Sequence, residues 1–178
     1  SSDVMGALYD RGEYDMAAFL RNGSHVADIS QIVFDADVDF TVLDRYTIPS
    51  DFSYDDIIGF AIEEAVDDVA VFFRNGSFIL DLTVNNLSQQ IDFDDSIRRF
   101  TLPAGFNISN AVGVEYDEGS GDAAIFFRNG SYVSDPSHTP LDGDISFTNV
   151  HVYTIPSGLS YDDIIGFGYT HTSDDVGA

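Results

Sequence analysis

Short apolar stretches alternate with polar turns along the whole chain. The clearest example runs from Asp68 to Asp81 (DVAVFFRNGSFILD), where two apolar runs flank an Arg-Asn-Gly-Ser turn. Apolar runs of this length between turn residues are typical of β-strands, and Asn-Gly between two such runs is a strong hairpin signal. We therefore expect two antiparallel strands joined by a type I′ turn, in which both central residues need a positive φ.

This hairpin belongs to a threefold internal repeat. Related copies are MAAFLRNGSHVAD (16–28) and AAIFFRNGSYVSD (123–135), and a second shared phrase appears as YTIPSDFSYDDIIGF (46–60), FTLPAGFNISNAVGV (100–114) and YTIPSGLSYDDIIGF (153–167). Self-similarity at such a period indicates a repeat architecture. We divide the single domain, 1–178, into repeats at approximately 3–55, 56–109 and 110–162, with an extra strand in 163–178.

Each repeat contains signals for four short strands. The first strand carries a glycine at the same place in every copy, at Gly6, Gly59, Gly113 and Gly166. Glycine inside a strand pattern indicates close backbone approach, so we expect these strands to pack tightly around a common axis. The hairpin supplies the second and third strands. After a polar, variable loop, the fourth strand ends at the proline of RYTIP, RFTLP or VYTIP, since proline cannot continue a ladder. The prediction is an all-β fold.

Two architectures accept four-stranded repeats, the β-propeller with one sheet per blade and the β-trefoil with three units. The count of three favours the trefoil. The order of the phrases instead resembles tandem repeats of bacterial and archaeal lectin-like β-propellers, of the form D-I-V-G-x-x-x … D-x-V-Y-x-W-Y-R-D-G-T … Y-x-L-P-x-G. The resemblance covers nearly the whole chain and implies propeller-like blades without a catalytic signature. This sequence departs from that pattern by its lack of tryptophan and by Asn-Gly-Ser at the turn.

The number of repeats bears on assembly. Three blades do not close a propeller, and the chain carries four first strands against three sets of the others. Repeat units bury their faces against neighbours, so an unpaired end favours association. We therefore expect the chain to partner itself, as a two-chain closed ring or as an open fibre formed by strand exchange, with the redundant first strand as the donor.

The charge balance narrows the classes of partner. The net charge of −24 arises from 31 acidic residues and 7 basic ones, and there is no lysine and no cysteine. Such a surface repels phosphates and anionic lipids, which argues against nucleic acid and membrane partners, and no apolar run is long enough for membrane insertion. The acidity suits either halophilic adaptation or calcium binding, and an extracellular or cell-surface location fits both.

The repeated turn supplies candidate ligand-binding residues. Arginine and asparagine could hydrogen-bond sugar hydroxyls while an aromatic residue stacks on a sugar face. These candidates are Arg21, Arg74, Arg128, Asn22, Asn75, Asn129, Phe78 and Tyr132. The alternative is structural, because arginines pair with carboxylates in an acidic protein and asparagine is favoured by the turn itself.

Loop carboxylates are the candidate metal ligands. Calcium prefers six to eight oxygen ligands. The sequence indicates no required cofactor and makes calcium a possible ligand. The candidates are Asp35, Asp37, Asp39, Asp92, Asp94, Asp142 and Asp144. A solvated acidic face is the alternative. Among the N-x-S/T sequences, turn chemistry explains the three in the hairpins, so Asn86 and Asn107 are the glycosylation candidates.

Repetition also bears on function. Three equivalent surfaces suit multivalent binding or assembly better than a single asymmetric reaction centre. The four histidines do not recur at equivalent positions, and no nucleophile–base arrangement is apparent. The first hypothesis is a non-enzymatic, extracellular, lectin-like carbohydrate-binding module. The alternative is an extracellular structural subunit of a filament or surface layer, assembled by strand exchange and stabilised by calcium.

Overall fold

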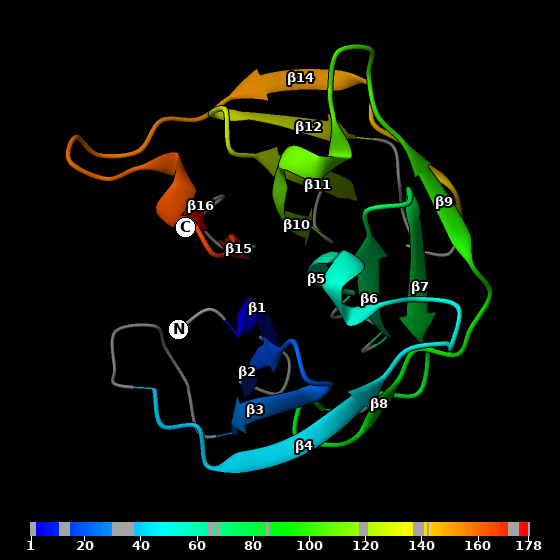
Figure 1. The fold of residues 1–178 in the computed structure, drawn as a ribbon. Helices are drawn as coiled ribbons and strands as arrows, with labels where there is room; N and C mark the ends of the chain where they lie inside the picture. Colours follow the sequence, from blue (N-terminus) through cyan, green and yellow to red (C-terminus); the bar gives the residue numbers. More distant parts are fainter. Residues whose placement is uncertain are drawn as a thin grey trace.

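The computed structural model describes residues 3–10, 15–29, 38–63, 66, 68–84, 86–117, 121–136, 141, 143–170 and 175–177. Within these residues the fold is all-β and propeller-like. Figure 1 shows three blades around a central axis, with the innermost strand of each blade at the centre. Of the two expected architectures, the propeller-like one is therefore observed.

Each complete blade is an antiparallel sheet of four strands in chain order. The innermost strands are β1 (Val4–Asp10), β5 (Ile57–Glu63) and β10 (Ala111–Asp117). The second strands are β2 (Asp15–Leu20), β6 (Asp68–Phe73) and β11 (Asp122–Phe127). The third are β3 (Ser24–Asp28), β7 (Ser77–Asp81) and β12 (Ser131–Asp135), and the outermost are β4 (Val42–Thr47), β9 (Arg98–Thr101) and β14 (Asn149–Val152). A short hairpin of β15 (Gly168–Thr170) and β16 (Asp175–Gly177) begins a fourth blade.

Two of the blades receive a fifth strand from the following repeat. In the segment expected to be only a loop, β8 (Ile91–Asp92) pairs in parallel with β4, and β13 (Ile145–Ser146) pairs in parallel with β9. The sequence carries a signal for this strand, an apolar-x-Phe pattern that recurs as Val38–Phe40, Ile91–Phe93 and Ile145–Phe147. Each added strand therefore joins one blade to the next.

The repeated glycines mark close contacts between neighbouring inner strands. A Cβ on Gly59 would lie 3.0 Å from the backbone nitrogen of Val114, and one on Gly113 would lie 3.0 Å from Phe167 Cδ2. A Cβ on Gly166 would lie 3.8 Å from the Cα of Gly6, which brings the start of the fourth blade against the first. The prediction that these glycines pack around a common axis is confirmed.

The hairpin turns differ from the expected type I′ geometry. Phe73 pairs with Ser77, which leaves a three-residue loop, and the Gly76 N–H donates to the Phe73 carbonyl at 3.1 Å. Gly76 has a φ of 82°, as a three-residue loop with a left-handed last residue requires. The glycines of the other two repeats have the same sign of φ.

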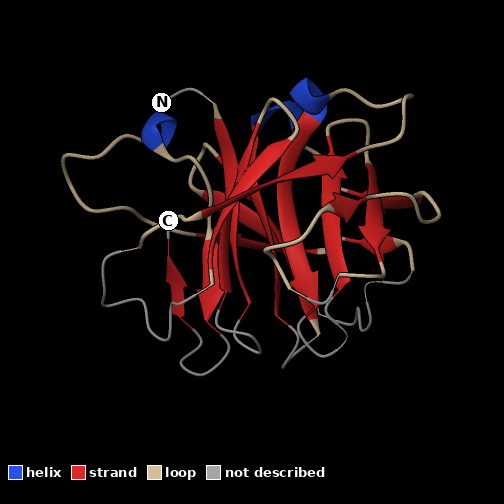
Figure 2. Ribbon diagram, turned by 90° about the horizontal axis from the view of Figure 1, so that it is seen from below, coloured by secondary structure: helices blue, strands red, loops and turns tan. Residues whose placement is uncertain are grey.

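The hydrophobic core lies between blades rather than in one central cluster. One large cluster joins residues of the first and second repeats, and a second joins those of the second and third. A third, smaller cluster packs Val112 and Phe126 against Ile164 and Phe167 at the start of the fourth blade. Figure 2 shows three one-turn helices at one end of the strands, η1 (Tyr54–Asp56), η2 (Ile108–Asn110) and η3 (Tyr161–Asp163). No helix among the described residues is long and apolar enough to cross a membrane.

Candidate functional site

The three repeated arginines fasten each blade to the turn that enters the next one. All three use Nη1 and reach the one-turn helix that leads into the following blade, at 2.9–3.4 Å. Their partners are the Asp55 carboxylate for Arg21, the Ile108 and Ser109 carbonyls for Arg74, and the Tyr161 and Asp162 carbonyls for Arg128. Burial lowers the pKa of the Arg74 guanidinium. Within this structure the arginines have a structural task in all three repeats.

The turn asparagines fold back onto their own turns. The Asn75 Oδ1 accepts hydrogen bonds from the backbone N–H and the hydroxyl of Ser77, at 3.0 and 2.5 Å. Asn22 and Asn129 make the same pair of contacts with the serine two residues later. Such Asx-type contacts explain why both asparagine and serine recur in the turn.

The candidate aromatic residues lie between blades. Phe78 is fully buried and stacks on Phe72 with ring centroids 4.7 Å apart, so in this structure it offers no face to a sugar. Tyr132 occupies the corresponding position of the third blade and stacks between Phe126 and His151. It is half-buried, because only the start of a fourth blade packs against this side.

Sequence reasoning missed the role of the buried aspartates that end each third strand. The Asp81 carboxylate accepts the N–H of Asp92 at 2.6 Å and also two hydrogen bonds from Thr83. The corresponding contact in the third repeat joins Asp135 to the Ser146 N–H at 3.0 Å. These carboxylates therefore position the added strands β8 and β13. Their regular spacing in the sequence was the signal that could have identified them.

Two of the acidic residues considered as calcium ligands, Asp92 and Asp144, have separate hydrogen-bond partners. Asp92 accepts hydrogen bonds from the Thr47 hydroxyl at 2.6 Å and from the Gln90 amide, and these bonds lower the pKa of its carboxyl group. The Asp144 carboxylate accepts the Arg99 N–H at 2.8 Å, and Asp94 is exposed. Within the described part of the chain, no three metal-ligating side chains converge. Three of the candidates, Asp35, Asp37 and Asp142, lie outside the described residues.

The two glycosylation candidates have different exposures. The Asn107 side chain is exposed and accepts the Ser109 N–H at 3.0 Å at the start of η2. The Asn86 side chain is half-buried and accepts two hydrogen bonds from Ser88. Modification at either residue stays a prediction, and Asn107 is the more accessible of the two.

An open pocket of about 550 Å³ lies beside the first hairpin turn. Its lining consists of Asn22, Gly23, Ser24, Leu43, Asp44, Arg45, Tyr46, Thr47 and Tyr54. The Tyr54 hydroxyl donates to the Tyr46 carbonyl at 3.2 Å, which fixes the ring against the turn. Burial raises the pKa of the Tyr46 hydroxyl strongly, and this hydroxyl donates to the Leu20 carbonyl at 2.6 Å.

The polar lining of this pocket differs among the repeats. Strand register places Arg45, Arg99 and Val152 opposite the serine that follows the turn in each blade. The preceding positions hold Asp44, Arg98 and His151. An acid–base pair of neighbouring side chains is therefore present in the first repeat alone, so the site lacks the threefold equivalence expected from the sequence.

Comparisons with known proteins found only distant structural likenesses. No family model and no curated protein matches the chain. Similar solved structures are described as "KlHsv2 with loop 6CD replaced by a Gly-Ser linker" (TM-score 0.46, 10% identity, 95% of this chain and 46% of that chain), "Structure of U3-55K" (0.41, 8%, 84% and 39%) and "Crystal structure of RRP9 WD40 repeats" (0.41, 6%, 85% and 39%). The chain thus spans less than half the length of each.

Proposed function

We propose that this protein is a non-enzymatic, extracellular binding module and that it binds a carbohydrate in the pocket beside the first hairpin turn. The pocket itself supports the proposal. Asp44, Arg45 and Asn22 present charged and amide groups in one open hollow. Such groups form paired hydrogen bonds with neighbouring hydroxyls, and the half-buried ring of Tyr54 supplies apolar surface.

The charge of the protein supports an uncharged ligand. With a net charge of −24, the chain repels phosphates and other anions at long range. The buried carboxylates of Asp28, Asp81 and Asp135 accept backbone N–H groups, which gives them a structural task rather than a catalytic one. A neutral sugar best suits this pocket, because its hydroxyls match the polar lining groups and the negative charge of the protein does not repel it.

A glycan array with the purified protein tests the proposal, followed by titration with any sugar that binds. The variant Arg45→Ala removes an exposed pocket group and should weaken binding about tenfold, because a hydrogen bond to a charged group contributes roughly 1.5–3 kcal/mol. Arg99→Ala changes the corresponding exposed residue of the second repeat and should leave affinity within about twofold. No binding on the array, or equal loss in both variants, would contradict the proposal.

A second candidate is an extracellular structural subunit of a filament or surface layer that assembles with itself. The observation that favours it is the open outer edge of the third blade, where β14 has no further strand beside it among the described residues. Light scattering and negative-stain imaging test this candidate, with and without a calcium chelator. Regular fibres or closed rings would support it. A monodisperse monomer at high concentration in calcium would count against it.

A further inference from the structure

The outer edges of the first two blades are covered in the same way. Tyr46 and Thr47 pair with Ile91 and Asp92, and the Phe93 N–H then donates to the Thr47 carbonyl at 3.0 Å. At the second blade, Phe100 and Thr101 pair with the strand Ile145–Ser146, and the next N–H donates to the Thr101 carbonyl at 3.1 Å. Each covering segment comes from the following repeat.

The outer edge of the third blade has the same local structure without the covering segment. The Tyr153 hydroxyl donates to the Phe127 carbonyl at 2.6 Å, as the Tyr46 hydroxyl does to Leu20. Tyr46 and Phe100 are 1% and 5% exposed, whereas the corresponding Tyr153 is only half-buried. The described residues include no strand on this side of β14. The edge is therefore formed, and no described residue covers it.

The first repeat carries a covering segment that has no edge to cover. Ile91 and Phe93 in the second repeat are 0% and 1% exposed, but the corresponding Val38 and Phe40 are 38% and 39% exposed. The segment is nevertheless held like the other two, because the Asp39 N–H donates to the Asp28 carboxylate at 2.7 Å. The covering segment of the first repeat is thus held in place but exposed.

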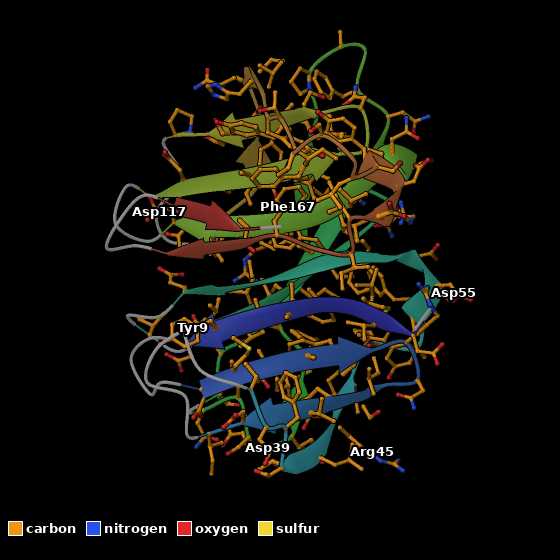
Figure 3. The ribbon with its side chains drawn as sticks, turned by 90° about the vertical axis from the view of Figure 1, so that its left-hand side faces the viewer. Tyr9, Asp39, Arg45, Asp55, Asp117 and Phe167 are labelled. Carbon is orange, nitrogen blue, oxygen red and sulfur yellow. The ribbon has the colours of Figure 1, made fainter. Side chains whose placement is uncertain are left out.

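The open edge of β14 and the exposed segment Val38–Phe40 both border the position of the fourth blade. β15 and β16 occupy the first two strand positions of this blade, and Gly166 lies against Gly6 of the first blade. Figure 3 looks onto this side of the molecule, with Phe167 near its middle and Asp39 at its lower margin. Tyr132 and Tyr153 face the same side as partly buried members of the small third core cluster.

We propose that the outer edge of β14 and the segment Val38–Phe40 are the two open ends of a four-bladed ring, and that a fourth copy of the repeat fills both. Its loop segment, with the spacing Leu-x3-Ile-x-Phe seen in Leu87–Phe93 and Leu141–Phe147, adds to β14 beside Tyr153 and Thr154. The outer strand of this fourth repeat pairs with Val38–Phe40. This assignment is independent of the proposed carbohydrate binding.

A second copy of the present chain fits this position less well. In a dimer, Val38–Phe40 of the second copy would have to cover β14 in the way that β8 covers β4. The first blade of the second copy would then occupy the position of β15 and β16. That arrangement would expel the segment that leads into β15, in which Phe167 stacks on Phe126 with ring centroids 4.0 Å apart. It would also fill one open end and leave the other vacant. The loop segment and the third and outer strands of a fourth repeat fill both ends, with β15 and β16 kept as the first two strands of that blade.

Disulfide capture of a peptide tests the vacant edge, and the absence of cysteine from the chain makes the chemistry site-specific. The probe is the peptide NLSQQIDFD, residues 86–94, with Asp92→Cys, and the protein is the full chain with T154C. Thr47 and Asp92 form the matching side-chain contact at the first blade, at 2.6 Å. In a glutathione buffer, T154C should capture this peptide about tenfold more than a peptide that also carries Ile91→Ser and Phe93→Ser.

The control variant is T47C, whose edge is already covered by β8. It should not distinguish the two peptides. A peptide of residues 96–104 with Thr101→Cys tests the other open end in the same way. It should be captured by D39C in preference to S146C, because Ser146 is already paired with Thr101.

Three outcomes would overturn the proposal. Equal capture of the two loop peptides by T154C would show that β14 is not a specific strand acceptor. Failure of D39C to prefer the outer-strand peptide would remove the second open end. A disulfide-linked dimer from a mixture of the D39C and T154C proteins would identify a second copy of the chain, rather than a fourth repeat, as the occupant. None of these results depends on sugar binding.

Discussion

The outer edges of the first and third blades have nearly the same sequence and local structure, but they differ in whether a further strand covers them. RYTIP ends the outer edge of the first blade and VYTIP that of the third, and both tyrosines donate a hydrogen bond back to their own hairpin. β8 covers the first edge, and the described residues place no strand on the third. The comparison teaches that an edge of this fold is completed by the next repeat rather than by its own residues.

The covering segments show the same contrast. In the second and third repeats the segment lies between two blades, and its apolar side chains are buried. In the first repeat the same aspartate contact holds a segment whose apolar side chains are exposed. Local hydrogen bonds therefore set the shape of the segment, while a neighbouring blade provides the hydrophobic stabilisation.

The largest expected difference concerns the phenylalanine of the covering segment. Phe93→Ala should lower the free energy of unfolding by about 3–5 kcal/mol, because it empties a buried site between two blades. Phe40→Ala at the corresponding exposed position should cost less than about 1 kcal/mol. Urea denaturation of both variants measures the difference. Similar losses would mean that the first segment is covered in solution.

A second difference concerns the axial glycines. Gly59→Ala should destabilise the chain by roughly 1–3 kcal/mol, since the new methyl group would lie 3.0 Å from the backbone of the next blade. Gly166→Ala has its nearest neighbour at 3.8 Å and should be close to neutral, within about 0.5 kcal/mol. Thermal unfolding of both variants checks this. A large loss in the second variant would indicate a tightly closed fourth interface.

Acid should loosen the covered edge through His25. Burial lowers the pKa of this imidazole, whose Nε2 lies 3.0 Å from the Leu87 carbonyl in the loop that leads to β8. The folded chain keeps His25 neutral, whereas the unfolded chain takes up a proton below the ordinary pKa of 6.5. Stability should therefore fall as the pH drops from 6.5 toward the lowered value.

The matched variant for this prediction is His25→Phe, because Phe78 occupies the corresponding position of the second repeat. Between pH 7 and pH 5 the unmodified chain should lose roughly 2–4 °C more in Tm than this variant. An identical pH dependence of Tm in the two proteins would show that His25 does not couple to folding in this range.

The smallest expected difference concerns the edge threonines. Thr47→Val removes the hydrogen bond to Asp92 and should cost about 0.5–1.5 kcal/mol, while Thr154→Val at the open edge should have no measurable effect. The first substitution should also raise the lowered pKa of Asp92 toward its ordinary value. Carboxyl titration by NMR follows that shift. An unchanged Asp92 pKa would mean that Thr47 does not hold this carboxylate.

Much of the fold follows from the sequence because the repeat constrains it. Strand alternation, the recurring Asn-Gly and the repeated glycine predict four-stranded units around an axis, and the fold has them. The added strands were missed because Ile91–Asp92 and Ile145–Ser146 are short segments within polar loops. Their partners lie in the preceding blade, so local sequence does not show the pairing.

Less of the candidate site could be predicted. The turn asparagines hydrogen-bond within their own turns. Among the turn arginines, Arg21 pairs with a carboxylate as the structural alternative expected, whereas Arg74 and Arg128 bond to backbone carbonyls. Phe78 follows a turn in the sequence, yet the next blade buries it, and only the tertiary arrangement determines this. The pocket combines a turn, an outer strand and Tyr54 of the next phrase, so its residues do not form one local motif.

Amide hydrogen exchange of the unmodified chain tests the contrast between covered and open segments most directly. The Phe93 and Phe147 N–H groups donate to the preceding blade. They should therefore exchange at least about a hundredfold more slowly than the Phe40 N–H of the exposed segment. That result would establish Val38–Phe40 as an open end of the ring. Equal protection of Phe40 would contradict the account, because it would mean that the first segment already has an edge to cover.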